Sequence, residues 1–184
     1  MFIRKIITNI FFIIIDFGSI LFQTREKRIA NILVKKNIKL STAESCTGGL
    51  LSSRLTDISG SSEYTFQNFV TYANNSKINQ LGVKSETIKK YGVVSEEVAL
   101  EMVQGLLKKE DCNLAVSTTG IAGPTGGTAT KPVGLICIGI GNKDIQKTFS
   151  FKANPLLFRR NMKYAFSNKV FDLLIDFLNK NYKS

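Results

Sequence analysis

The chain of 184 residues contains no histidine. This absence excludes nucleophile systems of the Ser-His-Asp and Cys-His kinds, and it excludes zinc sites that rely on histidine ligands. If the protein is an enzyme, its general base must therefore be a lysine, a tyrosine, an aspartate or a glutamate.

Cysteine is scarce as well. The three cysteines, Cys46, Cys112 and Cys137, are an odd number and show no CxxC spacing. That pattern argues against a disulfide framework and against a thiolate metal site, and it favours a reducing compartment. We therefore expect a cytoplasmic protein.

Acidic residues are few: 14 stand against 25 basic residues, which gives a net charge of +11. Such a balance is found in proteins that meet nucleic acid, a membrane surface or an anionic small substrate. The basic residues are scattered in pairs, however, and no helix-turn-helix or RNA-binding signature is visible. Nucleic-acid binding is therefore disfavoured, and much of the charge is expected on a solvated surface.

A long apolar run occurs only near the N-terminus. Residues 6–22 are mostly apolar, but the unbroken core from Ile10 to Ile15 covers only six residues. A membrane-spanning helix needs about 20 predominantly apolar residues, and no small-x-small cleavage site stands out. We expect residues 1–23 to be a non-catalytic apolar extension of uncertain order. Contact of residues 1–22 with a membrane surface, and a signal peptide, are the alternatives.

Residues 24–184 show alternating helical and strand patterns. The predicted helices are 24–37, 50–56, 84–90, 95–109 and 155–179, and the predicted strands are 38–43, 69–72, 114–118, 133–140 and 144–151. Strands alternate with helices early, and the last two strands form a hairpin around Gly141-Asn142. This order predicts a single α/β domain, a layered α/β/α arrangement with a mixed β-sheet.

Two glycine-containing loops follow predicted strands: SCTGG at 45–49 and TGIAGPTGG at 119–127. Glycine allows sharp turns and brings backbone N–H groups close to a ligand. Because ligand sites gather at the carboxyl ends of strands in open α/β sheets, the loops are expected to frame a pocket. The alternative is a pair of tight strand-to-helix turns. Neither loop has the P-loop or GxGxxG pattern.

Ser45 lies where a nucleophile would be exposed, at the turn from a strand to a helix. Serine needs a base, and lysine serves once burial or a neighbouring charge lowers its pKa. Tyr72 and Lys77 attract attention because FVTYANNSK runs off a strand end; a half-buried tyrosine and a surface lysine are the alternative. Glu44 either caps the following turn or contacts substrate. Cys46 is disfavoured as a nucleophile because no thiolate partner is evident.

Four segments together resemble the CinA C-terminal domain family: AESCTGG, LTDISGSSEYTFQNFVTYANNSK, GVVSEEVALEM, and TGIAGPTGG with KPVG. They follow the family's order and approximate spacing from about residue 24 to the C-terminus. Characterised members are nicotinamide-nucleotide amidohydrolases. The resemblance implies deamidation of nicotinamide mononucleotide to nicotinate mononucleotide and ammonia. It also implies a small-molecule nucleotide as partner, a homo-oligomer, no metal and no cofactor.

The resemblance further implies a Ser–Tyr–Lys site on Ser45, Tyr72 and Lys77. Ser45 would attack the carboxamide, Lys77 would accept its proton, and Tyr72 would relay or orient. We expect backbone N–H groups of 47–49 to form the oxyanion hole, and Lys131 or Arg160 to help the second loop hold the phosphate. The full set of expected substrate-binding residues is Glu44, Thr47, Gly48, Gly49, Thr119, Gly120, Ala122, Gly123, Lys131 and Arg160.

Three departures from the family are visible. The chain is too short to contain the additional N-terminal domain of the larger fused forms. Its second loop reads PTGG where members usually show PGGG, and Thr128-Ala129-Thr130 stands where members usually have a more acidic link before KPVG. Residues 151–155 stand where members often have a glycine-aspartate-arginine turn. These changes concern substrate affinity rather than the chemistry. With the apolar N-terminus, they also motivate the alternative of a catalytically silent pyridine-nucleotide-binding or competence-associated accessory protein.

Overall fold

A five-stranded sheet in the order β2-β1-β3-β4-β5 forms the centre of the protein. The computed structural model describes residues 2–21, 24–109 and 112–182. Its strands are β1 (Leu40–Glu44), β2 (Thr65–Val70), β3 (Leu114–Gly120), β4 (Leu135–Gly141) and β5 (Gln146–Lys152). β1 pairs in parallel with both β2 and β3, whereas β3, β4 and β5 pair antiparallel. The predicted mixed sheet and its late hairpin are confirmed.

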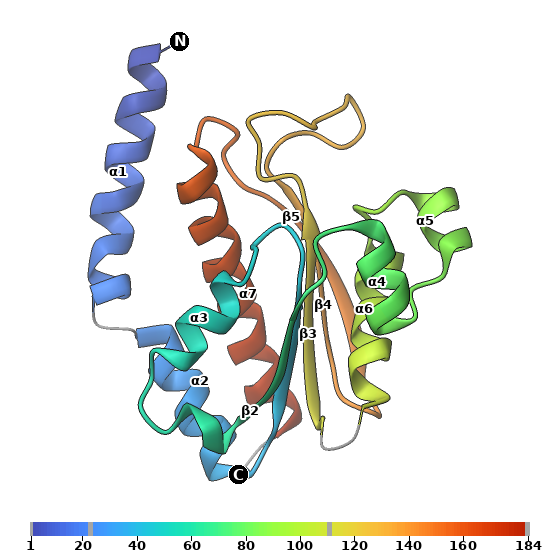
Figure 1. Cartoon of the computed structure of the whole chain (residues 1–184). Coiled ribbons are helices and arrows are strands. Elements are labelled where there is room, and N and C mark those ends of the chain that lie inside the picture. Colours follow the sequence, from blue (N-terminus) through green and yellow to red (C-terminus); the bar gives the residue numbers. More distant parts are fainter. Residues whose placement is uncertain (1, 22–23, 110–111, 183–184) are drawn as a thin grey trace.

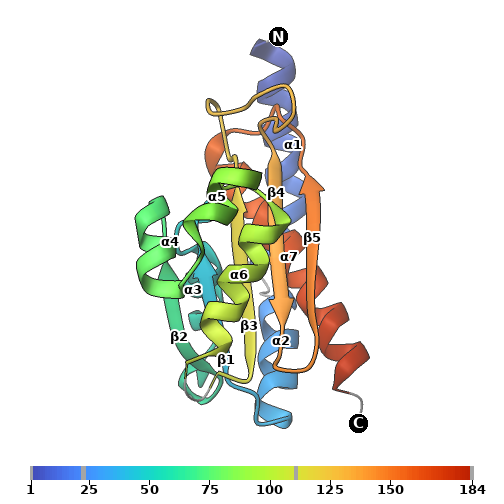
Figure 2. The same cartoon turned by 90° about the vertical axis from the view of Figure 1, so that its right-hand side faces the viewer.

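Helices cover both faces of the sheet (Figures 1 and 2). One face carries α2 (Thr24–Lys35), α3 (Leu50–Thr56) and α7 (Arg159–Asn181), with α1 (Phe2–Leu21) outside them. The other face carries α4 (Asn74–Leu81), α5 (Ser85–Tyr91) and α6 (Glu96–Leu107), and a short 3-10 helix, η1 (Ser61–Glu63), precedes β2. The predicted α/β/α layering is therefore confirmed.

The two central parallel strands are buried on both faces. Every residue of β1 is buried, and so is β3 from Leu114 to Thr119. On one side an apolar cluster joins Leu40 and Val116 to side chains of α2, α3 and α7, such as Phe171. A second cluster on the other side contains Ala115 and the buried face of α6. Continuous burial of this kind is expected of parallel strands that have helices on both faces.

Two elements differ clearly in their bounds from the sequence prediction, and one helix was not predicted. β2 covers Thr65–Val70 rather than 69–72, and α7 begins at Arg159 rather than near 155. The segment before α7 is instead a turn, in which Asn154 Oδ1 accepts the N–H of Leu156 at 3.0 Å. The helix α4 was not predicted, because asparagine and serine favour turns over helix interiors. Burial of Lys77 and Leu81 accompanies this helix in spite of its composition.

The N-terminal extension, whose order the sequence did not specify, forms the helix α1 over residues 2–21. Residues 1, 22 and 23 of the expected extension lie outside the described residues. Within the ranges that the structure describes, no helix is both long and apolar enough to cross a membrane.

A buried ion pair joins the three inner helices on the α7 side of the sheet. The Arg54 guanidinium lies 2.6 Å from Glu26 Oε1, so α3 is tied to α2. Arg54 also donates to Asn168 Oδ1 at 2.8 Å and to Ser167 Oγ, both on α7, and its guanidinium lies 4.6 Å from the ring centre of Phe171. Removal of one partner from a buried pair is strongly destabilising, because the other charge stays uncompensated.

We expect Glu26→Gln to lower the free energy of unfolding by about 3 kcal/mol, because Arg54 would stay buried without its carboxylate. Asp172→Asn is the matched control, since it removes the acid of a partly exposed pair with Arg25, at 2.7 Å, and should cost less than about 1 kcal/mol. Urea unfolding of both variants measures the difference. Equal effects would show that burial of the Arg54 pair contributes no special stability.

Candidate active site

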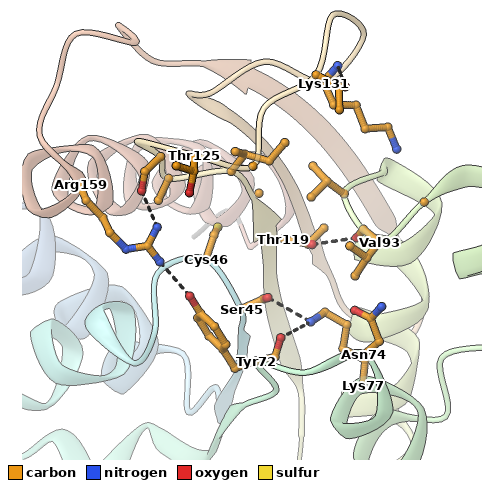
Figure 3. A pocket seen from close by; sticks show the side chains of 18 residues that line it. Ser45, Cys46, Tyr72, Asn74, Lys77, Val93, Thr119, Thr125, Lys131 and Arg159 are labelled. Carbon is orange, nitrogen blue, oxygen red and sulfur yellow. Dashed lines mark hydrogen bonds between the residues drawn. The ribbon is translucent and has the colours of Figure 1, made fainter.

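A pocket of about 410 Å³ opens at the carboxyl ends of β1, β2 and β3 (Figure 3). β1 lies between β2 and β3. After β1 the chain forms β2 on one side of it, and later forms β3 on the other side, so the strand order reverses at β1. Ligand sites of open α/β sheets lie at such a switch point. The lining residues are Ser45, Cys46, Tyr72, Asn74, Lys77, Gly92, Val93, Val94, Thr119, Gly120, Ile121, Ala122, Gly123, Thr125, Gly126, Thr128, Lys131 and Arg159.

Ser45 is the first residue after β1, and the neighbouring strand β3 holds its turn in place. The Ser45 N–H donates to the Thr118 carbonyl oxygen at 3.0 Å, and the hydroxyls of Thr47 and Thr118 are 2.9 Å apart. Gly48 and Gly49 then adopt φ values of 61° and 88°. Residues other than glycine rarely adopt this left-handed conformation, so the Gly-Gly pair lets the chain reverse directly into α3.

Glu44 is buried below this turn and does not line the pocket. Its carboxylate accepts the N–H groups of Leu51 at 3.0 Å and Ser52 at 2.8 Å, and the Ser52 hydroxyl at 2.6 Å. Of the two roles considered for Glu44, the structure shows the capping role: a negative side chain satisfies the free donors at the start of α3. The expected substrate contact of Glu44 therefore finds no support in its position.

The Lys77 amine is fully buried beside Ser45. Lys77 Nζ donates to Ser45 Oγ at 3.0 Å, to the Thr71 carbonyl oxygen at 2.6 Å and to the Tyr72 carbonyl oxygen at 3.3 Å. No carboxylate of the described residues forms an ion pair with it. Burial lowers the pKa of Lys77, and the nearby Cys46 opposes this shift only in part.

This arrangement suits a lysine that acts as a general base. The two carbonyl oxygens can accept N–H groups from either the charged or the neutral amine. The Ser45 hydroxyl can reverse its role, because it accepts from an ammonium group but donates to the lone pair of a neutral amine. The lowered pKa favours the neutral form that a base requires.

The Tyr72 side chain points away from this pair. Its hydroxyl accepts from Arg159 Nη2 at 2.8 Å, and Arg159 Nη1 donates to the Gly123 carbonyl oxygen at 2.6 Å (Figure 3). Among the described residues, the hydroxyl makes no hydrogen bond with Ser45 or Lys77, and 60% of the Tyr72 side chain is exposed. The contact of Tyr72 with Lys77 is made by its backbone carbonyl oxygen, and the expected relay through its phenol finds no geometric support.

Cys46 also lines the pocket, but its thiol is not activated. Burial raises its pKa to about 12. A cysteine nucleophile needs the opposite shift, since the thiolate is the reactive form. This agrees with the expectation that Cys46 is not the nucleophile.

The second glycine-containing loop forms the opposite wall. Thr119, Gly120, Ala122 and Gly123 line the pocket, as expected. The Thr119 hydroxyl donates to the Val93 carbonyl oxygen at 2.8 Å, so it braces the wall. A Cβ atom on Gly120 would lie 2.6 Å from the Leu135 carbonyl oxygen and 3.0 Å from Cys46 Sγ, so only glycine permits this close packing.

The basic side chains of the lining are Lys77, Lys131 and Arg159, and no acidic side chain lines it. Arg160, expected to hold a phosphate, is exposed and lies outside the lining. Successive residues of an α-helix point about 100° apart, so of these two neighbouring arginines Arg159 faces the pocket and Arg160 does not. Lys131, the other expected phosphate ligand, lines the pocket and donates to the Tyr91 carbonyl oxygen.

Two further groups were missed from the sequence. Asn74 lines the pocket from the first turn of α4. Lys163, one turn after Arg159, approaches the Ser45 turn: a Cβ atom on Gly48 would lie 3.2 Å from its Nζ. Arg159 and Lys163 are four residues apart, so they lie on the same face of α7. This spacing is a sequence signal that could have indicated the two residues together.

Thr47, Gly48 and Gly49 do not line the pocket, contrary to expectation. The Gly48 N–H already donates to the Ser45 carbonyl oxygen at 3.1 Å, because the turn closes on itself there. It is therefore not free to join an oxyanion hole.

Three comparisons relate this chain to known proteins. A family model described as the CinA C-terminal domain matches residues 22–178. A CinA-like protein of Chloroherpeton thalassium is 48% identical over 155 residues, which cover 81% of this chain and 37% of that protein. The solved structure of competence/damage inducible protein CihA from Agrobacterium tumefaciens is 38% identical with a TM-score of 0.79, over 84% of this chain and 95% of that one. A CinA superfamily protein from Klebsiella pneumoniae reaches a TM-score of 0.81 at 26% identity, over 85% of this chain and 97% of that one.

The chain thus spans only about a third of the length of the curated relative, but nearly the whole of the solved domains. The match begins at residue 22 and therefore leaves the whole of α1 outside the shared domain. The family match, the close relative and the shared fold agree with one another. The chain belongs to the CinA C-terminal domain family.

Proposed function

We propose that this protein is an amidohydrolase that converts nicotinamide mononucleotide and water to nicotinate mononucleotide and ammonia. The observation that carries the proposal is the buried Lys77 amine 3.0 Å from Ser45 Oγ, without a carboxylate to hold its proton. A serine nucleophile with a lysine base needs no histidine, and this chain has none.

Acylation begins when neutral Lys77 accepts the hydroxyl proton of Ser45. Ser45 Oγ then attacks the carboxamide carbon, and the carbonyl oxygen becomes an oxyanion. The Lys77 ammonium returns the proton to the amide nitrogen as the C–N bond breaks. Ammonia leaves, and an ester joins Ser45 to the nicotinoyl group.

Deacylation follows the same path with water as the nucleophile. Lys77 accepts one proton of the water, and the resulting hydroxide attacks the ester carbon. When the C–O bond to Ser45 breaks, Lys77 returns that proton to Ser45 Oγ. The carboxylate product is released, and the site regains its initial protonation state after the acid loses its own proton to solvent.

The pocket supports an anionic nucleotide as substrate. Its volume of about 410 Å³ falls within the usual range of small-molecule sites, and its charged side chains are all basic. Arg159 lies at the rim, where its planar guanidinium could pair with two phosphate oxygens. We assign the phosphate to Arg159 in place of Arg160, with Lys131 on the opposite side.

We expect Ser45→Ala and Lys77→Met each to lower kcat by at least about 1,000-fold, because the nucleophile and its base act as a unit. Methionine keeps most of the buried lysine stem while it removes the amine. Release of ammonia and of nicotinate mononucleotide measures the rate, and Lys89→Met on the exposed surface of α5 is the control. Undiminished activity in both site variants would refute the mechanism.

Saturable nucleotide binding without turnover in the unaltered protein would favour the silent accessory protein instead.

The pH dependence should report Lys77 directly. The neutral amine is the active base, so kcat/KM is lost as pH falls through the Lys77 pKa and reaches its plateau above it. Because burial lowers this pKa, the plateau should begin below the pH at which a solvent-exposed lysine titrates. Initial rates at subsaturating substrate locate this limb. A kcat/KM that keeps rising up to the ordinary lysine range would show that Lys77 is not shifted in the working enzyme.

The phosphate assignment predicts a difference between two neighbouring arginines. Arg159→Ala should raise KM for nicotinamide mononucleotide about 10- to 100-fold, since a charge-assisted hydrogen bond contributes about 1.5–3 kcal/mol. Its effect on nicotinamide riboside, which lacks the phosphate, should be much smaller. Arg160→Ala is the matched control and should change neither. Equal losses for both substrates in Arg159→Ala would remove Arg159 from the phosphate site.

A further inference from the structure

The helix α1 attaches to the domain through a polar side chain. Asn9 is 2% exposed, and its Oδ1 accepts the Phe158 N–H at 2.6 Å and the Asn161 amide at 2.8 Å. Its Nδ2 donates to the Leu156 carbonyl oxygen at 3.0 Å. These bonds turn the Asn9 side of α1 toward the start of α7 and thereby determine which face of α1 points outward.

The outward face is apolar, the reverse of an ordinary surface helix. Ile3, Ile7, Ile10 and Ile14 follow the spacing of one helical stripe, and six large apolar residues of α1 have exposed fractions between 51% and 72%. Those residues are Ile3, Ile7, Ile10, Phe11, Ile13 and Ile14. Single exposed apolar side chains are common, but six on one helix make a patch of the kind that marks an interaction surface.

An apolar groove lies beside this face. It has a volume of about 310 Å³ and runs between α1 and the segment from β5 to α7. Phe11 and Phe12 line it from α1, and Phe151, Ala153 and Leu157 line it from the other side. The groove extends the apolar surface of α1 onto the domain itself.

The surrounding charge identifies what covers this surface. The helix α1 carries Arg4, Lys5 and one acid, Asp16, whereas residues 151–165 carry four basic residues and no acid. The second segment includes the groove wall and the start of α7, which α1 contacts. A second copy of the chain would bring two such basic regions together, which is unfavourable, whereas an anionic surface complements them.

We propose that the apolar face of α1 docks on an anionic membrane surface, with the helix in the plane of the interface and the basic residues against lipid headgroups. No described helix is able to cross a membrane, so the helix lies on the bilayer. Apolar burial and electrostatic attraction then act together, as they do in peripheral amphipathic anchors.

Co-sedimentation of the whole chain with vesicles tests this proposal. We expect strong binding to vesicles of phosphatidylglycerol and phosphatidylcholine, weak binding to phosphatidylcholine alone, and a loss of affinity at high salt. Ile7→Glu with Phe11→Glu should reduce the affinity on the order of 100-fold. Val34→Glu with Ile145→Glu introduces the same charge at exposed positions away from α1 and should reduce it far less.

Thermal unfolding shows whether both double variants keep the fold, which outward positions should permit. Equal losses of vesicle binding in the two variants would overturn the proposal, because net charge alone would then account for the binding. Absence of binding to anionic vesicles would also overturn it. A dimer in light scattering without lipid, lost only in the α1 variant, would assign the surface to a second copy instead.

Discussion

The amine of Lys77 is buried, no carboxylate in the described part of the chain pairs with it, and the site is organised around the oxygen atoms that accept its hydrogen bonds. Two of these are the backbone carbonyls of Thr71 and Tyr72, directly after β2, and the third is the hydroxyl of Ser45, directly after β1. One side chain on α4 thus joins the ends of two parallel strands. Burial of a charged amine is costly and therefore favours the neutral form, and the same three contacts stay satisfied in that form because the Ser45 hydroxyl then donates.

The turn that carries Ser45 depends on a second buried group with the opposite charge. The Glu44 carboxylate is satisfied entirely by α3 and its Ser52 side chain, so it holds the helix against the end of β1. Thr118 of β3 fixes the same turn from the other side. Ser45 is therefore held between two rigid elements, which is the condition for a precisely placed nucleophile.

The layered fold and the position of the pocket were predictable, because strand periodicity and glycine loops are local signals. Ser45, Tyr72 and Lys77 were assigned through the family resemblance, and the structure brings Ser45 and Lys77 together. The role of Glu44 and the phase of α7 were not predictable. The role of Glu44 depends on how the glycine turn brings the start of α3 back to the end of β1. The phase of α7 depends on a local bond of Asn154 and on a contact distant in sequence, that of Asn9, and the start of α7 decides whether Arg159 or Arg160 faces the pocket.

The extra helix α1 and the pocket meet at the same few residues. Asn9 binds the N–H of Phe158, the residue before Arg159, so a contact outside the shared domain adjoins the pocket rim. The basic residues at the start of α7 thus face two regions at once, the pocket and the side of the molecule that carries α1.

Arg159 bridges the mouth of the pocket, from the Tyr72 hydroxyl to the Gly123 carbonyl oxygen. An anion that binds this guanidinium competes with both partners, so its binding is an exchange of hydrogen bonds rather than a simple gain. The observed affinity would then be the difference between two sets of contacts at one side chain. Removal of the Tyr72 hydroxyl alone would weaken the competing set of hydrogen bonds and leave the guanidinium more available, so Tyr72 influences how strongly the pocket binds an anion.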